Sequence, residues 1–259
     1  MASMPPASAP VRSSPHIVDV LIAERAPRLT RSAAWPLVRP GLYALLGYRK
    51  ARHMADAIAP MSGEETLRHV SDLLHLKVEA AHLERLPAAG RCIVVCNHPT
   101  GIADGIAVYD AIRRRRGDAV FFANADALRV SPRLSETVIP VEWVQDKRTR
   151  DKTRATLQAA RDAFEAERCV VMFPAGRLAR VESDGLLADP EWAPTAASLS
   201  RKFDAPVIPM HVTGPYKIGR AVQQECRDRI ANLVCRLLLE KIVMTTVSGG
   251  LLHHFFVVF

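Results

Sequence analysis

The strongest constraint on the fold is an alternation of short β-branched runs and longer helical patterns through the middle of the chain. Apolar runs of strand length lie at 91–96, 119–123, 138–144, 169–173 and 206–212. Helical patterns lie at 102–116, 151–167 and 194–203. Continuous apolar strands that alternate with helices are typical of α/β proteins, whose sheet is buried on both faces. We therefore predict an α/β fold with a mostly buried mixed sheet flanked by helices.

The regions outside this alternation are expected to be separate segments. Residues 1–15 are small, polar and rich in proline, which favours a disordered tail. Residues 33–77 are expected to form an N-terminal helical segment, and the S-x-x-E spacing of Ser62 and Glu65 predicts a helix that begins there. The apolar stretch 33–48 is either an interfacial helix or a helix packed on the domain. The main domain would then span 78–240.

Residues 241–259 are harder to interpret, because they end in bare hydrophobic side chains. They are either a terminal pair of strands or an altered end of the chain. No apolar run approaches the ~18 residues that a membrane-spanning helix needs, so we do not expect an integral membrane protein. Cys92 and Cys96 have three residues between them and no second cysteine pair, so we expect no metal site and a reducing, cytoplasmic compartment.

The charge balance points to anionic partners. The 259 residues include 35 Lys and Arg against 27 Asp and Glu, a formal net charge of +8. Such an excess favours nucleic acid, acidic lipid headgroups or a phosphorylated substrate. Aromatic residues make up 6% of the chain and do not alternate with the arginine clusters, which disfavours nucleic acid.

One turn carries candidate catalytic residues. The sequence NHPTGIADG, at 97–105, follows the strand run 91–96 and places His98 before Asp104. A carboxylate at this point can accept a hydrogen bond from one imidazole nitrogen and leave the other to take up a proton. Asp104 could equally cap the helix that begins near Ile102, while His98 binds a backbone carbonyl. The spacing leaves both interpretations open.

Basic residues follow the ends of other predicted strands. Arg177 and Arg180 come after 169–173, and guanidinium groups suit bidentate phosphate contacts. Lys147 and Arg148 are the cations nearest the end of 138–144, although most of the charge run there is expected to be a solvated face. The run 113–116 (RRRR), at a helix end, is expected to complement the helix dipole and contact acidic headgroups.

Together with FPAGR at 173–177 and APVIPMHVTG at 205–214, the NHPTGIADG turn resembles the glycerolipid (lysophospholipid) acyltransferase family, particularly its hemolysin-like and ornithine-lipid-type branch. The resemblance covers roughly residues 80–214. It implies transfer of a fatty acyl group from acyl-CoA or acyl carrier protein to the hydroxyl of a lysolipid, without a cofactor. His98 would be the general base and Asp104 its orienting carboxylate. The resemblance assigns these residues to substrate binding: Asn97, Gly101, Lys147, Arg148, Pro174, Gly176, Arg177 and Arg180.

The chain departs from the family pattern at two points. Five residues separate His98 from Asp104, where four are commoner, and Ala175 and Arg177 stand where the family usually has a glutamate. Arg177 would then favour an anionic acceptor. We expect a peripheral enzyme on the anionic inner face of the cell membrane. The alternatives are a non-catalytic lipid-binding relative and a thioester hydrolase.

Overall fold

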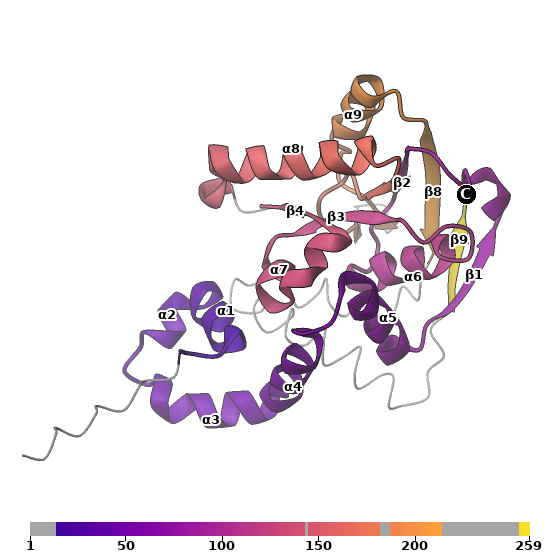
Figure 1. The fold of residues 1–259 in the computed structure, drawn as a ribbon. Coiled ribbons are helices and arrows are strands. Elements are labelled where there is room, and N and C mark those ends of the chain that lie inside the picture. The colour runs from indigo at the N-terminus through magenta and orange to yellow at the C-terminus, as the bar shows by residue number, and fades with distance from the viewer. Residues whose placement is uncertain (1–13, 143–144, 182–186, 214–253) are drawn as a thin grey trace, which may run out of the picture.

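The computed structural model describes residues 14–142, 145–181, 187–213 and 254–259 (Figure 1). Within these residues the main sheet has seven strands in the order β1-β9-β8-β2-β5-β3-β4. Neighbouring strands are parallel except for β8 and β9, so the predicted mixed α/β sheet is confirmed. The strands are Lys77–Ala81 (β1), Cys92–Cys96 (β2), Val120–Asn124 (β3), Val138–Val141 (β4), Cys169–Met172 (β5), Arg180–Val181 (β6), Leu187–Ala188 (β7), Val207–Thr213 (β8) and His254–Val258 (β9).

Helices cover both faces of this sheet, with α5 and α6 on one side and α8 and α9 on the other (Figure 1). The α-helices are Ile17–Arg25 (α1), Pro27–Thr30 (α2), Trp35–Leu45 (α3), Tyr48–Ile58 (α4), Gly63–Leu74 (α5), Ile102–Ile112 (α6), Asp126–Val130 (α7), Arg150–Glu165 (α8) and Thr195–Phe203 (α9). Short 3-10 turns lie at Leu83–Arg85, Pro132–Glu136 and Gln145–Lys147.

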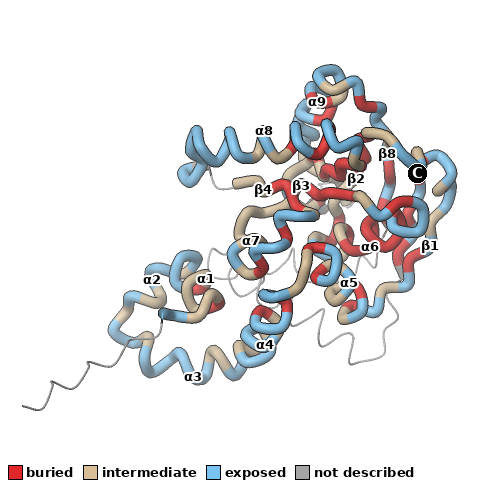
Figure 2. Tube along the Cα trace, viewed as in Figure 1, coloured by how far each residue is buried: buried red, intermediate tan, exposed pale blue. Residues whose placement is uncertain are grey.

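Strand β2 shows why the central strands are unbroken apolar runs in the sequence. Cys92, Val94 and Cys96 point into the core beneath α6, whereas Ile93 and Val95 point into the core beneath α8 and α9. All five side chains are buried, as Figure 2 shows for the centre of the sheet. Side chains alternate between the two faces of a strand, so burial of both faces demands an apolar residue at every position.

The N-terminal segment forms helices from Ile17 to Leu74 and lies beside the sheet domain (Figure 1). Val18, Ile22 and Ala55 pack α1 against α4. The predicted cap at α5 is present: Ser62 N donates to Glu65 at 2.7 Å, and Glu65 N donates to the Ser62 hydroxyl at 3.2 Å. Among the described residues, no helix combines the length and apolar character that crossing a bilayer requires. The predicted tail falls mostly on residues 1–13, which lie outside the described residues.

The end of the chain belongs to the sheet. Strand β9 lies between β1 and β8, parallel to β1 and antiparallel to β8. The expected domain span 78–240 therefore leaves out strand β9 at one end. At the other end it leaves out Lys77, the first residue of β1. Residues 214–253 lie outside the described residues, so the possible strand pair near 249–250 is not described.

The basic run 113–116 serves the domain itself. Arg116 is buried, forms an ion pair with Asp118 and donates to two backbone carbonyls. Arg114 and Arg115 also donate to backbone carbonyls, which belong to β1 and to the turn before β2. The expected headgroup contact is wrong for Arg116, because this side chain is buried. Arg113, Arg114 and Arg115 are exposed, and for them the contact stays a prediction.

Candidate active site

The loop between β2 and α6 is built around the carboxylate of Asp104. Asp104 is fully buried and accepts hydrogen bonds from Thr100 N at 2.7 Å, Gly101 N at 2.8 Å and the Thr100 hydroxyl. These bonds satisfy peptide N–H groups that a helix leaves unpaired at its first turn. Gly101 has φ +97°, a conformation that glycine adopts without strain. The capping role that the spacing allowed for Asp104 is therefore present in the structure.

The same carboxylate faces His98. Nδ1 of His98 lies 3.2 Å from Oδ2 of Asp104, but its N–H is not aligned with that oxygen and Nδ1 has no hydrogen bond. Nε2 also lacks a hydrogen bond among the described residues, and the His98 side chain is 21% exposed. The geometry therefore suits an imidazole that accepts a proton at Nε2 and is oriented through Nδ1.

The backbone of His98 is held by the segment that follows β5. His98 N donates to both oxygens of Asp189, at 3.2 and 3.3 Å, and Asp189 also accepts from the indole of Trp192 at 3.0 Å. His98 O accepts from Ala179 N at 3.0 Å. The ring of Phe173 packs on the imidazole with a centroid distance of 4.4 Å. Sequence reasoning missed Asp189, although the Asp-Pro step at 189–190 just before α9 is a turn signal.

The FPAGR residues lie beside His98. Pro174 is buried, and its carbonyl accepts from Ala193 N at 3.1 Å. Gly176, with φ +61°, turns the chain toward Arg177 and Arg180, which flank the Ala179 that bonds to His98. Both arginines are exposed, and no carboxylate pairs with either guanidinium among the described residues. They lie in a loop and in β6, not on a helix.

The predicted ligand residue Asn97 has a structural partner. Its side-chain amide donates to Val212 O at 2.9 Å and accepts from Val212 N at 2.7 Å. Both ends of the amide are thus used to join the site loop to β8. Gly101 contributes its backbone N–H, which donates to Asp104. A Cβ at this position would lie 3.3 Å from the Leu178 side chain, which leaves little room for a larger residue.

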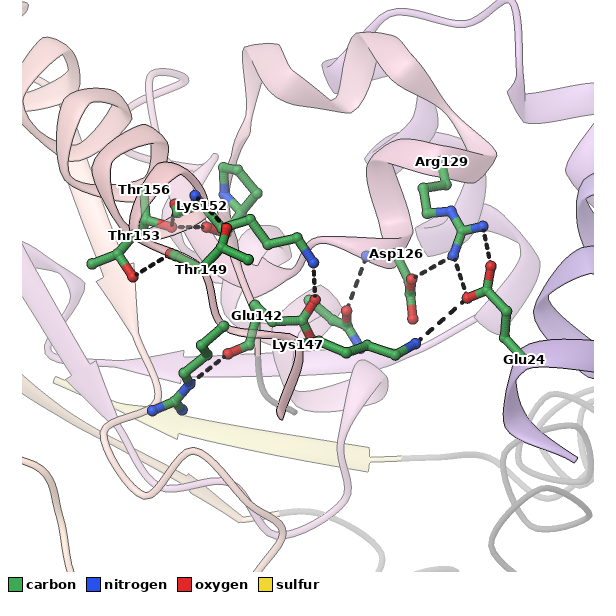
Figure 3. A network of polar contacts seen from close by, with 12 residues as sticks. Glu24, Asp126, Arg129, Glu142, Lys147, Thr149, Lys152, Thr153 and Thr156 are labelled. Carbon is green, nitrogen blue, oxygen red and sulfur yellow. Dashed lines mark hydrogen bonds and ion pairs between the residues drawn. The ribbon is translucent and has the colours of Figure 1, made fainter. Parts of the chain in front are cut away.

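Lys147 and Arg148 lie elsewhere. Figure 3 shows Lys147 reaching toward Glu24 of α1, with an Nζ to Oε2 distance of 3.6 Å, and Arg148 Nε donates to Glu142 O at 2.9 Å. These residues follow β4, three strand positions from β2, which corresponds to about 14 Å at the usual strand spacing. The structure does not bring them to His98.

Glu24 joins the N-terminal helices to the domain. Arg129 binds both of its oxygens at 2.8 Å (Figure 3). These hydrogen bonds, together with the charges of Arg129 and Lys147, lower the pKa of Glu24 to about 2, although partial burial opposes the shift. Lys147 therefore belongs to an ion-pair network that holds α1 against α7.

Comparisons with known proteins agree on one family. The family model described as "Acyltransferase" matches residues 77–213. The chain is 31% identical over 153 residues to a lyso-glycine lipid O-acyltransferase of Phocaeicola vulgatus, covering 59% of this chain and 52% of that protein. It is 28% identical over 152 residues to a lyso-glycine lipid O-acyltransferase of Bacteroides thetaiotaomicron, covering 59% and 54%. The matched region thus spans about half the length of these relatives.

A solved structure was also matched. The 1-acyl-sn-glycerophosphate acyltransferase PlsC of Thermotoga maritima aligns with 91% of this chain and 98% of its own, with a TM-score of 0.41 and 13% identity.

Proposed function

Since this chain belongs to the acyltransferase family, we propose that it transfers a fatty acyl group from an acyl thioester to the hydroxyl of a lysolipid. The observation that carries this proposal is the pairing of His98, which is partly exposed, with the buried carboxylate of Asp104. The names of the two lyso-glycine lipid O-acyltransferases support a lysolipid acceptor.

The reaction follows from the properties of the two side chains. Nε2 of His98 takes the proton of the acceptor hydroxyl while that oxygen attacks the thioester carbonyl carbon. The carbon–sulfur bond then breaks, and the imidazolium returns the proton to the departing thiolate. Asp104 stabilises the imidazolium between these steps. A thioester is reactive enough that no covalent enzyme intermediate is needed.

Arg177 and Arg180 suit an anionic acceptor. They flank the residue whose N–H binds His98 O, and no described carboxylate neutralises them. We propose that they bind a carboxylate or phosphate in the lysolipid headgroup through bidentate hydrogen bonds. Pro174 and Gly176 shape this loop.

A peripheral position on the inner face of the cell membrane would bring the enzyme to its acceptor. Helix α3 has no buried residue and presents Leu37 and Leu45, which are 86% and 65% exposed, together with Val38. An amphipathic helix with basic neighbours such as Arg39 can lie in the headgroup layer. Each basic residue near an anionic leaflet contributes about 1 kcal/mol.

The test compares His98→Ala with His53→Ala, a matched exposed histidine on α4. Purified protein is given a radiolabelled acyl thioester and a lysolipid, and both diacyl product and free fatty acid are measured. We expect His98→Ala to lose product formation and His53→Ala to keep it. Full activity in His98→Ala would overturn the mechanism. Fatty acid release without an acceptor would indicate a hydrolase, and lipid binding without thioester consumption would indicate a non-catalytic relative.

Lipid profiling of cells with and without the protein identifies the acceptor. We expect one diacyl lipid to be lost and its lyso form to accumulate when the protein is absent.

A further inference from the structure

A second charged surface lies on α8, away from His98. A groove of about 650 Å³ runs along the exposed side of α8 toward the end of α9, and the two helices cover the same face of the sheet (Figure 1). Its lining includes five cationic side chains and no carboxylate. The cations are Arg148, Arg150, Arg154, Arg161 and Lys202.

The sequence of α8 separates its two faces. Arg150, Arg154, Leu157 and Arg161 are spaced at i, i+4, i+7 and i+11, which places them along one side of a helix. The buried residues 160, 163 and 164, which pack on the sheet, lie on an adjoining side of the helix. The acidic residues of α8 do not line the groove.

Three of the groove cations on α8 form no ion pair with a described carboxylate, whereas Arg148 donates to Glu142 O. Arg150, Arg154 and Arg161 are exposed, and no carboxylate pairs with them in the part of the chain that the structure describes. Arg129, by contrast, is bound by two carboxylates in the ion-pair network of α1 and α7. Like charges lined up on one face repel each other, and this repulsion is relieved when an anionic partner binds.

The shape of the charged surface indicates what kind of anion fits. Arg150 and Arg161 are separated along the helix axis by about 16 Å at 1.5 Å per residue. Leu157, 55% exposed, lies between them and is the groove's apolar side chain. The lining contains no aromatic ring on which a purine could stack. An extended set of cations around an apolar centre fits an acidic helix of a protein better than a nucleotide.

The position of the groove is suited to donor delivery. Helix α8 begins at Arg150, after the carboxyl end of β4, and β4 is parallel to the strands that carry the active-site loops. The groove therefore starts at the same edge of the sheet as His98, within reach of a long flexible arm.

We propose that this face of α8 is the docking surface for acyl carrier protein, a small acidic protein that presents its acyl thioester on such an arm. The proposal rests on the acyl transfer proposed above. It names the donor partner and the surface that selects it.

The test uses the full chain with Arg150→Glu, Arg154→Glu and Arg161→Glu combined. The matched control carries Arg28→Glu, Arg31→Glu and Arg49→Glu, three exposed arginines without a described ion pair, located on the N-terminal helices. Binding of purified acyl carrier protein is measured by fluorescence anisotropy, and circular dichroism checks the fold of each variant. KM and kcat are then measured with acyl-ACP and with acyl-CoA.

We expect the α8 variant to bind acyl carrier protein at least tenfold more weakly and to raise the KM for acyl-ACP by a similar factor, with kcat and the KM for acyl-CoA unchanged. The control variant should bind acyl carrier protein as tightly as the wild type. Wild-type binding should also weaken between 50 and 500 mM salt, because added salt screens charges on a surface. The salt dependence is measured on the wild type alone, so it does not depend on the folding of any variant.

A rise in the KM for acyl-CoA would assign the groove to nucleotide phosphates and overturn the proposal, as would equal acyl carrier protein binding by variant and wild type. Binding is scored without turnover, so an enzyme that binds acyl carrier protein but transfers no acyl group would refute the proposed function and leave the docking surface standing.

Discussion

The carboxylate of Asp104 has two tasks that different substitutions separate. It accepts three hydrogen bonds from the turn at 100–101, and it faces Nδ1 of His98. Asp104→Asn keeps a carbonyl oxygen for the two peptide N–H groups and turns its amide toward the Thr100 hydroxyl, which can accept. Asp104→Ala removes every acceptor. The first substitution therefore changes mainly the charge, and the second also breaks the turn.

The expected magnitudes follow from burial. An unsatisfied buried donor costs about 1–3 kcal/mol, so the loss of three acceptor bonds in Asp104→Ala should lower the free energy of unfolding by about 3–6 kcal/mol. Asp104→Asn should cost about 1–2 kcal/mol. Loss of the negative charge should nevertheless lower kcat/KM by about 10²–10⁴-fold, the usual contribution of positioned acid–base catalysis.

Urea denaturation gives the stability change, and release of thiol from the acyl donor gives kcat/KM. Wild-type activity in a folded Asp104→Asn would show that the charge of Asp104 does not assist His98. Wild-type stability in Asp104→Ala would show that its hydrogen bonds do not hold the turn. Either result would refute the corresponding part of the reasoning.

Three further predictions concern the surroundings of the site. Gly101→Ala should lower the free energy of unfolding by about 1–3 kcal/mol, because φ is +97°, and an unchanged urea midpoint would argue against strain there. Asp189→Ala should lower kcat at least tenfold while KM stays constant. Asp189→Asn should keep most of the wild-type kcat, because its amide oxygen still accepts from His98 N. Equal kcat values in the two variants would exclude positioning of His98 through this bond. The pKa of Glu24 is lowered from 4.5 to about 2, chiefly by Arg129, so its ion pair stabilises the fold above pH 4.5 and is lost as pH falls toward 2. Between pH 5 and 3, the free energy of unfolding from thermal melts should thus fall by about 1 kcal/mol more in the wild type than in Glu24→Gln, since the pair is exposed. Parallel pH curves for the two proteins would contradict this prediction.

Much of the fold could be predicted because the central strands β2 and β5 bury both faces, while α5 and α8 each bury one side. The run 138–144 became a strand at Val138–Val141, and the helix expected from Ser62 begins at the predicted cap. Strand β1 was not predicted, because its burial alternates and it carries Lys77 and Glu79, so it resembles a polar segment. Its pairing partner comes from the far end of the chain, which local patterns cannot show.

The site could be predicted in part. The approach of His98 to Asp104 could be predicted, because a strand end and the first turn of the next helix are adjacent in any such fold. Asp189 could not be found in this way, since it reaches His98 N only after a return of the chain of about ninety residues. Lys147 was expected near the substrate, but residue spacing does not reveal that Glu24, from a separate helix, binds it instead.

The pairing of β1 with β9 also has a consequence for how the domain folds. Val78 pairs with Phe255, so β1 has no neighbour in the sheet until a segment far along the chain has arrived. Contacts between residues so distant in sequence require the closure of a large loop and slow the folding of a domain. The remaining strands, from β4 to β8, can associate before this step, which makes the joining of β9 a late event. Until then the core-facing side chains of β8 and α6 at this edge are open to water and to other chains, so this edge is where the partly folded domain is most prone to aggregate.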